Sequence, residues 1–325
     1  MNIRIAICGY GNLGHGAALA VQNSPDAELA AIFTRRPPQP LQTGCAAPVL
    51  PLSAIRHWRE KVDVLLLCGG SATDLPRQTP DLAADFNTVD SFDTHAKIPA
   101  HFAAVDRSAR ASAHLSLICA GWDPGLFSVA RSLFSSVLPN GSTATFWGRG
   151  VSQGHSDAIR RLPGVQDARE YTVPIPEAIS AAENGAPGAY SAVTSHRREC
   201  FVVASPGADR DRIERKIREM PDYFAGYETS VTFVSQEELD RTHAALPHGG
   251  RVIRSGQTAD GHRHTLSLGL RLNSNPEFTG GVLVAYARAV FRLRREGRTG
   301  CITPLDIAPC YLSPLTAQQA RERLL

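Results

Sequence analysis

The glycine pattern near the start of the chain is the first feature that suggests chemistry. Residues 9–14 read GYGNLG, after an apolar run and before an alanine-rich segment. In a strand–turn–helix unit, Gly9 permits the tight turn, Gly11 lets the backbone approach a pyrophosphate, and Gly14 lets helix and strand pack closely. The free N–H groups at the start of such a helix bind phosphate. The pattern therefore predicts a dinucleotide site.

Two arginines indicate which dinucleotide binds there. A second apolar run, 29–33, is followed by Thr34, Arg35 and Arg36. An NAD site would carry Asp or Glu at this point to hold the ribose 2′-hydroxyl, whereas arginine suits a 2′-phosphate. The sequence predicts NADP(H) as the cofactor. Without the glycine turn upstream, a solvated loop leading into the proline-rich stretch 37–40 would be the better interpretation of the arginines.

Two aspartates follow neighbouring apolar runs beside the expected nicotinamide position. Asp93 comes after the fourth run and Asp123 after the fifth. Paired carboxylates suit a cationic amine, which they hold and from which one of them takes a proton. The alternative for each is a helix cap or an Asx-turn, and Asp123 stands directly before Pro124.

A glycine-rich segment later in the chain, 148–157, suits an anion. It opens a predicted helix with Ser156 or Asp157 as N-cap, which leaves N–H groups for a ligand carboxylate. A simple capped loop explains the segment equally well.

The elements that must position these residues are near-continuous apolar runs in the first third of the chain. Five such runs are typical of parallel strands covered on both faces: 3–7, 29–33, 62–68, 87–90 and 115–120. Helix-compatible segments lie between them, such as 53–61 and 99–112. We predict an α/β fold with a Rossmann-like doubly wound parallel sheet, in which ligands bind outside the carboxyl ends of the strands.

From about residue 143 the pattern changes, and a second domain is predicted. Strand-like stretches alternate with a few helices, which favours an α+β domain with a mostly antiparallel sheet: strands 143–147, 199–204, 228–234 and 264–272, helices 205–222 and 279–296. We expect a dinucleotide-binding domain at 1–121, with 300–325 packing back onto it. Residues 122–299 would form a substrate-binding and dimerisation domain.

The composition excludes several classes of protein. Of the 325 residues 43% are hydrophobic and 20% are charged, as in ordinary globular proteins. A net charge of +3 is too small to indicate nucleic-acid binding, and no apolar run approaches the ~20 residues that span a bilayer. The seven cysteines lack any C-x-x-C pair, which argues against a disulfide framework and against a metal site. We expect a cytoplasmic protein without a metal.

Seven short blocks, in order along nearly the whole chain, resemble the meso-diaminopimelate D-dehydrogenase family. They are GYGNLG at 9–14, TRR at 34–36, GSATD at 70–74, GWDPG at 121–125, TFWG at 145–148, SQGHSDA at 152–158 and MPDYF at 220–224. The resemblance implies a homodimeric enzyme for NADP-dependent, reversible oxidative deamination of the D-centre of meso-2,6-diaminopimelate, in lysine and cell-wall precursor synthesis. The products would be L-2-amino-6-oxopimelate and ammonia.

The resemblance also implies roles for single residues. Asp93 and Asp123 would hold the D-centre amine and act in catalysis, with Trp122 and Trp147 walling the pocket. Around the two carboxylates and the far amine, the expected residues are Gln153, Gly154, His155 and Asp157 for the D-centre carboxylate side, Thr172, Arg198 and His248 for the L-centre carboxylate, and Asn275 for the far amino acid group. The expected cofactor contacts are Gly9, Tyr10, Gly11, Asn12, Leu13, Gly14, Thr34, Arg35, Arg36, Gly70, Ser71, Ala72, Thr73, Asp93, Thr94, His95, Asp123, Pro124, Gly125, Leu126 and Phe127.

Other functions fit the sequence less well. Dihydrodipicolinate reductase would show paired histidines and a lysine, aspartate-semialdehyde dehydrogenase a nucleophilic cysteine at a helix start, and a Gfo/Idh-type sugar dehydrogenase Glu-Lys-Pro after a strand. None of these signatures is present. An NADPH-sensing regulator that lost its chemistry would have a disrupted second-domain pocket, whereas the candidate contacts are all present here.

Overall fold

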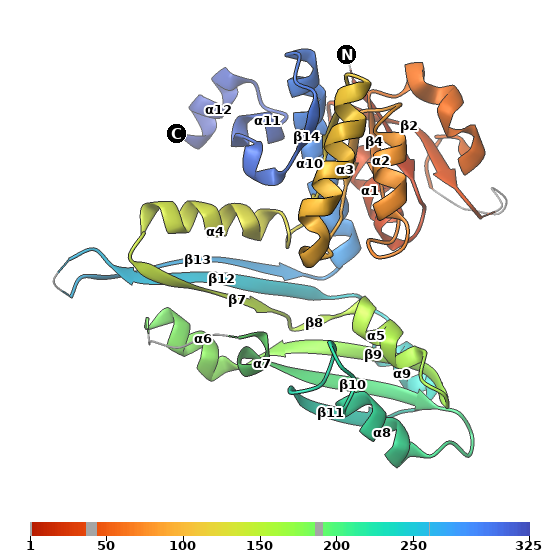
Figure 1. Ribbon diagram of the computed structural model, residues 1–325, viewed down its shortest axis with the longest axis vertical. Helices are drawn as coiled ribbons and strands as arrows, with labels where there is room; N and C mark the ends of the chain where they lie inside the picture. The colour runs from red at the N-terminus through yellow and green to blue at the C-terminus, as the bar shows by residue number, and fades with distance from the viewer. Residues whose placement is uncertain (1, 37–43, 186–190, 260) are drawn as a thin grey trace. The chain divides into compact units, whose positions relative to one another are not determined.

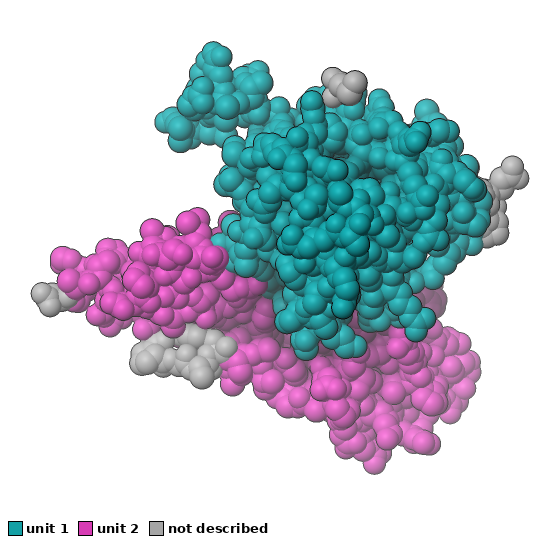
Figure 2. Space-filling model, turned by 45° about the horizontal axis from the view of Figure 1, so that its top comes forward, with its two compact units in different colours: residues 1–129, 276–325 teal, residues 130–275 magenta. Residues whose placement is uncertain are grey.

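The computed structural model divides the chain into two compact units. Unit 1 consists of residues up to 129 together with 276–325, and unit 2 of residues 130–275 (Figure 2). The structure describes residues 2–36, 44–185, 191–259 and 261–325, so the proline-rich stretch 37–40 lies outside the described residues.

Unit 1 is built on a seven-stranded parallel sheet in the order β14-β6-β5-β4-β1-β2-β3. This confirms the predicted Rossmann-like α/β fold. The elements are β1 (Ile3–Cys8), α1 (Asn12–Gln22), β2 (Ala27–Thr34), β3 (Val49–Pro51), η1 (Leu52–Lys61), β4 (Val64–Leu67), α2 (Leu75–Leu82), β5 (Thr88–Asp90), η2 (His95–Lys97), α3 (Ile98–Ala111), β6 (Leu115–Leu117), α10 (Asn275–Arg295), β14 (Gly300–Ile302), η3 (Pro304–Asp306), α11 (Pro309–Leu312) and α12 (Ala317–Leu324), labelled where space allows in Figure 1. Helix α4 (Leu126–Val137) begins in unit 1 and continues into unit 2.

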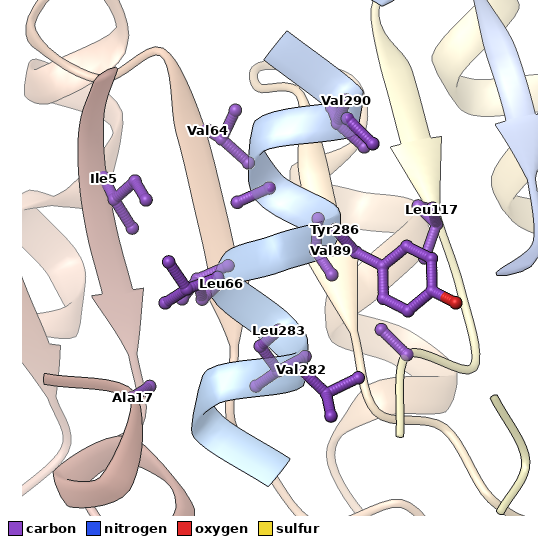
Figure 3. Close-up of a cluster of buried hydrophobic side chains, with 14 of the residues drawn as sticks. Ile5, Ala17, Val64, Leu66, Val89, Leu117, Val282, Leu283, Tyr286 and Val290 are labelled. Atoms are coloured by element: carbon purple, nitrogen blue, oxygen red, sulfur yellow. The ribbon is translucent and has the colours of Figure 1, made fainter. Parts of the chain in front are cut away.

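Both faces of this sheet are buried, which explains the unbroken apolar runs. Ile5 and Leu66 point into a core formed with α1 and α10, whereas Leu65 and Leu67 point into a second core formed with α2 and α3. In Figure 3, Leu283 and Tyr286 of α10 lie against the strand residues of the first core.

The placement of α10 corrects the predicted domain boundaries. The whole of this helix was expected in the second domain (122–299), but from Pro276 onward it belongs to unit 1, and the boundary expected after residue 121 lies after residue 129. A close helix contact explains the packing: a Cβ on Gly16 would lie 2.4 Å from the Pro276 carbonyl oxygen, and one on Gly280 would lie 2.4 Å from the Ala17 nitrogen. Only glycine permits α1 and α10 to approach so closely. Residues 300–325 also belong to unit 1, through β14.

Unit 2 has two sheets, one of four strands (β11-β10-β9-β8) and one of three (β13-β12-β7), and all pairs but β10–β11 are antiparallel. The long strands β7, β12 and β13 run side by side in Figure 1. The elements are β7 (Gly141–Trp147), β8 (Gly150–Val151), α5 (Gln153–Arg160), β9 (Val165–Pro174), α6 (Pro176–Glu183), α7 (Ala192–Ser195), β10 (His196–Ala204), α8 (Arg210–Arg218), β11 (Glu228–Phe233), α9 (Gln236–Thr242), β12 (His248–Gln257) and β13 (Arg263–Leu272).

Several local expectations were wrong. The segment expected as a helix at 53–61 is a 3₁₀ helix, and the helix expected over 205–222 covers only Arg210–Arg218. Strands β9 and β12 were not predicted at all. Within the described parts of the chain, no helix is long and apolar enough to cross a membrane.

Candidate active site

The predicted cofactor residues follow the carboxyl ends of the parallel strands in unit 1. Gly9 directly follows β1 with φ at +97°, and its N–H donates to the Phe33 carbonyl oxygen of β2 at 2.8 Å. A Cβ on Gly14 would lie 2.1 Å from the Gly9 carbonyl oxygen, so only glycine fits there. The turn is thus fixed by backbone geometry, as the glycine spacing predicts.

The start of α1 fits a pyrophosphate. Gly11 is its N-cap and provides no side-chain cap, and a Cβ on Gly11 would meet nothing within 4 Å. The helix therefore has open space in front of its first N–H groups, which favour a negative charge.

Arg35 does not lie isolated in solvent. Its guanidinium makes two hydrogen bonds to the Asp74 carboxylate, at 2.9 and 3.0 Å, although 72% of the side chain is exposed. Asp74 Oδ2 also accepts the Gly70 N–H at 3.0 Å. Asp74 therefore joins the loop after β4 to the arginine after β2, a role that the sequence analysis missed. Arg36 is exposed, and its N–H donates to Thr34 Oγ1 at 3.1 Å.

The loops after β4 and β5 are joined by a hydroxyl. Ser71 Oγ accepts the N–H of Asp93 at 2.9 Å and lies 3.3 Å from Thr94 Oγ1. Asp93 itself is exposed. Of the predicted residues in unit 1, Ser71, Asp93 and Thr94 are therefore brought together.

A buried carboxylate joins the loops that carry the two predicted catalytic aspartates. Asp90, at the end of β5, is fully buried, and its Oδ1 accepts the N–H groups of Phe92 and Cys119, both at 3.0 Å. Its Oδ2 accepts Thr79 Oγ1 and His101 Nε2, both at 2.8 Å. The Asp93 loop and the segment that leads to Asp123 thus share one acceptor. The signal for this residue in the sequence is a carboxylate at the end of an apolar run.

The segment that carries Asp123 is compact. The Phe127 N–H donates to the Trp122 carbonyl oxygen at 2.8 Å, and the Leu126 N–H donates to the Gly121 carbonyl oxygen at 3.0 Å. The Trp122 ring is buried and packs edge-on against Phe127, with ring centroids 5.2 Å apart. Asp123 is half-buried and lies three residues before α4.

In unit 2, the register of β9 and β10 brings Thr172 and Arg198 opposite each other. Arg198 Nη1 donates to Thr172 Oγ1 and lies 3.5 Å from Oε1 of Glu170, and its guanidinium lies 4.2 Å from the centre of the Tyr227 ring. Arg198 is 7% exposed and Glu170 is fully buried. A buried guanidinium next to a hydroxyl suits a carboxylate. Sequence reasoning missed Glu170, because the strand that buries it, β9, was not predicted.

Helix α5 presents His155 to the same region, but its predicted N-cap was wrong. The cap is Ser152, not Ser156 or Asp157, and its Oγ accepts the His155 N–H at 3.4 Å and lies 2.5 Å from His155 Nδ1. The Ser156 hydroxyl accepts the N–H of Glu170 at 2.9 Å, because the helix packs against β9. Burial, and to a smaller extent the Arg198 cation, lowers the pKa of His155 to about 4. The imidazole is therefore neutral at physiological pH.

His248 lies on the other side of Thr172. Gly150 of β8 pairs with Thr172, and a Cβ on Gly150 would lie 2.4 Å from the His248 ring. Burial lowers the pKa of His248, so this imidazole too is neutral. Thr172 thus lies between Arg198 on β10 and the part of β8 that contacts His248.

The Trp147 backbone is held by a histidine that the sequence analysis missed. The Trp147 N–H donates to His196 Nε2 at 2.9 Å, and His196 Nδ1 donates to the Ala192 carbonyl oxygen at 2.9 Å. The two rings lie 5.3 Å apart.

The remaining predicted residues of unit 2 are less closely tied to this cluster. Gln153 and Gly154 are exposed in the first turn of α5. Asp157 pairs with Arg160 at 2.5 Å and with Arg161 at 3.5 Å, and 53% of its side chain is exposed. Asn275 donates its N–H to the Leu246 carbonyl oxygen at 3.0 Å.

All seven cysteines are free thiols, and over the described ranges no group of three or more His, Cys, Asp or Glu residues is arranged to hold a metal ion.

The doubly wound sheet with its glycine turn, together with a second α+β unit, defines a dinucleotide-dependent dehydrogenase of the α/β class. A model of the diaminopimelic acid dehydrogenase C-terminal domain matches residues 121–274, and the meso-diaminopimelate D-dehydrogenase of Acetivibrio thermocellus is 51% identical over 99% of this chain and 98% of its own. The chain belongs to the meso-diaminopimelate D-dehydrogenase family and is an amino acid dehydrogenase.

Solved structures agree with this assignment. A mutant meso-diaminopimelate dehydrogenase from Clostridium tetani, crystallised with diaminopimelate, is 48% identical, with a TM-score of 0.95 and 100% of both chains covered. An engineered D-amino acid dehydrogenase bound to NADP⁺ is 42% identical, with a TM-score of 0.90 and 100% of both chains covered.

Proposed function

We propose that this chain catalyses the reversible, NADP-dependent oxidative deamination of the D-centre of meso-2,6-diaminopimelate to L-2-amino-6-oxopimelate and ammonia. The observation that carries the proposal is the buried Arg198 of unit 2. Its Nε is buried and makes no hydrogen bond to any described residue, although a guanidinium normally has a partner for each N–H. With Thr172 and His248 beside it, it is suited to the L-centre carboxylate of the substrate.

Unit 1 would hold the cofactor. The open space before α1 takes the pyrophosphate, and Arg35 and Arg36 recognise the 2′-phosphate. Arg35 is held by Asp74 in an orientation fixed by two hydrogen bonds. When bound, NADP⁺ supplies the hydride acceptor.

The substrate amine must lose a proton before its carbon can give up hydride, because an ammonium nitrogen has no lone pair to form the imine. Free α-amines are mostly protonated at neutral pH. Asp123 orients the amine and takes this proton, and Asp93 holds the ammonium form on binding. Water then adds to the imine carbon, and the C–N bond breaks to release ammonia. No covalent bond to the protein is formed.

The direct test is NADP⁺ reduction with the three stereoisomers of diaminopimelate. The meso isomer should react at its D-centre, and the LL isomer should not react. The DD isomer should react poorly because its far centre has the wrong configuration for Thr172, Arg198, His248 and Asn275. Equal rates with the meso and LL isomers would refute the proposed stereochemistry.

The aspartate is tested by Asp123→Asn. We expect kcat to fall by about 10²-fold or more with NADP⁺ affinity unchanged, because the amide cannot take a proton. Wild-type oxidation should become faster toward alkaline pH. A variant with near-normal kcat would reduce Asp123 to a structural residue before Pro124.

We further propose a cytoplasmic homodimer. The seven free thiols favour a reducing compartment. On α4, Leu133 and Val137 are 59% and 62% exposed, an apolar surface that a second copy would cover. Light scattering of the wild type and of a Leu133→Asp, Val137→Asp variant tests the dimer.

A further inference from the structure

Glu170 is a buried acid for which neither the family resemblance nor the proposed reaction provides a role. Its side chain is fully inaccessible to solvent, in the middle of β9. Buried carboxylates are costly unless they are paired and hydrogen-bonded. A leucine at this buried position would destabilise the fold less, so the presence of a carboxylate requires an explanation.

The hydrogen bonds of Glu170 are incomplete. Oε1 accepts Thr172 Oγ1 at 3.3 Å and lies 3.5 Å from Arg198 Nη1, a long contact for an ion pair. Oε2 is buried and makes no hydrogen bond to any described residue, and the same holds for Nε of Arg198. Glu170 and Arg198 therefore share a buried site, and each has one buried polar atom without a hydrogen bond to any described residue.

The titratable and charged groups near Glu170 come from β10, α5 and α8. Cys200 lies opposite Glu170 on β10, and among the described residues Arg198 is the cation that lowers the pKa of Glu170. Glu199, on the same strand, adds a small repulsion. From α5, His155 faces Arg198 as a neutral imidazole, because its pKa is about 4. From α8, Arg218 acts on the neighbouring Cys200 thiol.

Burial exceeds the pull of Arg198 and raises the pKa of Glu170 to about 7. The carboxyl group is thus partly protonated near neutral pH. If a ligand carboxylate binds next to Arg198, it and Glu170 share one guanidinium. Because two negative charges so close repel each other, the pKa of Glu170 rises further.

We propose that Glu170 is a positioning residue for the substrate's far carboxylate: it orients Arg198 in the free enzyme and takes up a proton when that carboxylate binds. The proton comes from solvent and forms an O–H bond at Oε2, which adds one positive charge for the one negative charge that the ligand carboxylate brings. The site then holds one cation and one anion. This inference rests on the proposed contact of Arg198 with the L-centre carboxylate.

The coupling between proton uptake by Glu170 and substrate binding sets the sign of the pH dependence. Because the protonated form binds the ligand, affinity is high below pH 7 and falls as pH rises, by at most about tenfold per pH unit. The effect falls on the dissociation constant and on KM, whereas kcat depends on chemistry at the D-centre.

The experiment counts protons in a complex that cannot react, the enzyme with NADPH and meso-diaminopimelate. Isothermal titration in buffers of different ionisation enthalpy gives the protons taken up on binding. At pH 8 the wild type should take up close to one proton per site with meso-diaminopimelate and clearly less with D-lysine. D-lysine has the same two amines and D-centre carboxylate but lacks the far carboxylate.

Two variants complete the test. Glu170→Gln mimics the protonated acid, so meso-diaminopimelate should no longer cause more proton uptake than D-lysine. The KM of this variant should not rise above pH 7, and its kcat should stay within about twofold of the wild type. Glu199→Gln is the matched control: Glu199 follows Arg198 in the sequence but pairs with Arg149, and its repulsion on Glu170 is the smallest of the electrostatic effects there, so this variant should keep the proton uptake and shift the pH profile of KM only slightly. If Glu170→Gln does not fold, the comparison of the two ligands on the wild type still decides.

The outcomes separate this inference from the proposed function. Equal proton uptake with both ligands, or a Glu170→Gln variant with the wild-type pH profile, would overturn the role of Glu170. Arg198→Met should raise KM for meso-diaminopimelate about 10- to 150-fold, the value of one charge-assisted contact. If KM is unchanged in Arg198→Met, Arg198 does not bind the substrate carboxylate, and the proposed contact on which the role of Glu170 rests is refuted.

Discussion

Asp90→Asn tests whether one buried carboxylate holds together the loops that carry Asp93 and Asp123. Four donors meet this side chain: two backbone N–H groups on Oδ1 and two side-chain donors, from Thr79 and His101, on Oδ2. The substitution changes neither volume nor shape, so its effect isolates the hydrogen bonds.

The magnitude follows from the geometry. In either orientation, the amide places an NH₂ group opposite two donors, so two of the four hydrogen bonds are lost. Hydrogen bonds to a charged acceptor contribute roughly 1.5–3 kcal/mol each, which gives a loss of about 3–6 kcal/mol. This is a large part of the ~5–15 kcal/mol by which folded proteins are stable. Misplaced loops should also lower kcat by about tenfold or more at temperatures where the variant is folded.

The assay combines thermal unfolding with amide hydrogen exchange. Exchange at the Phe92 and Cys119 amides should accelerate, because these N–H groups donate to Asp90. Asp81→Asn is the control: its side chain is 62% exposed in a surface pair with Arg56, so it should cost only ~0–1 kcal/mol. A loss below about 1 kcal/mol for Asp90→Asn, with unchanged exchange and kcat, would refute the reasoning.

Three further predictions concern the cofactor turn, cofactor choice and acid stability. Gly14→Ala should fold poorly, because its Cβ would lie 2.1 Å from a backbone oxygen. Gly11→Ala, whose Cβ would meet nothing within 4 Å, should melt like the wild type but bind NADP⁺ more weakly. Equal melting temperatures of the two variants would contradict the expectation for Gly14, and unchanged NADP⁺ affinity of Gly11→Ala would contradict the expectation for Gly11. Replacing Arg35 and Arg36 by alanine should weaken NADP⁺ by about 10- to 150-fold per lost contact and NAD⁺ much less, so equal losses in titrations with both would show that the arginines do not recognise the phosphate. The pKa of His155 is about 4 in the folded protein and about 6.5 when unfolded, so its burial contributes stability above pH 6.5 that is lost as pH falls toward 4. His155→Phe should flatten the decrease of the melting temperature in that range, and a parallel curve would count against the neutral imidazole.

The sequence by itself determined most of the parallel sheet of unit 1 and its ligand-binding edge. Parallel strands buried on both faces are continuous apolar runs, and their carboxyl ends meet along one edge, so local patterns place the loops after β1, β4 and β5 without tertiary information. The glycine turn was equally local, since the constraint on Gly14 comes from a carbonyl five residues away.

Only the tertiary structure decided the site in unit 2 and the position of α10. Thr172 and Arg198 are 26 residues apart and meet because β9 and β10 pair in one antiparallel register. No period in the sequence specifies that register, and the charged residues in β9 conceal the strand itself. Likewise, α10 joins unit 1 through a helix crossing between Gly16 and Gly280, far apart in the chain. Glu170 shows the limit most clearly: a carboxylate in a sequence is most often exposed, and its burial next to Arg198 is a property of packing alone.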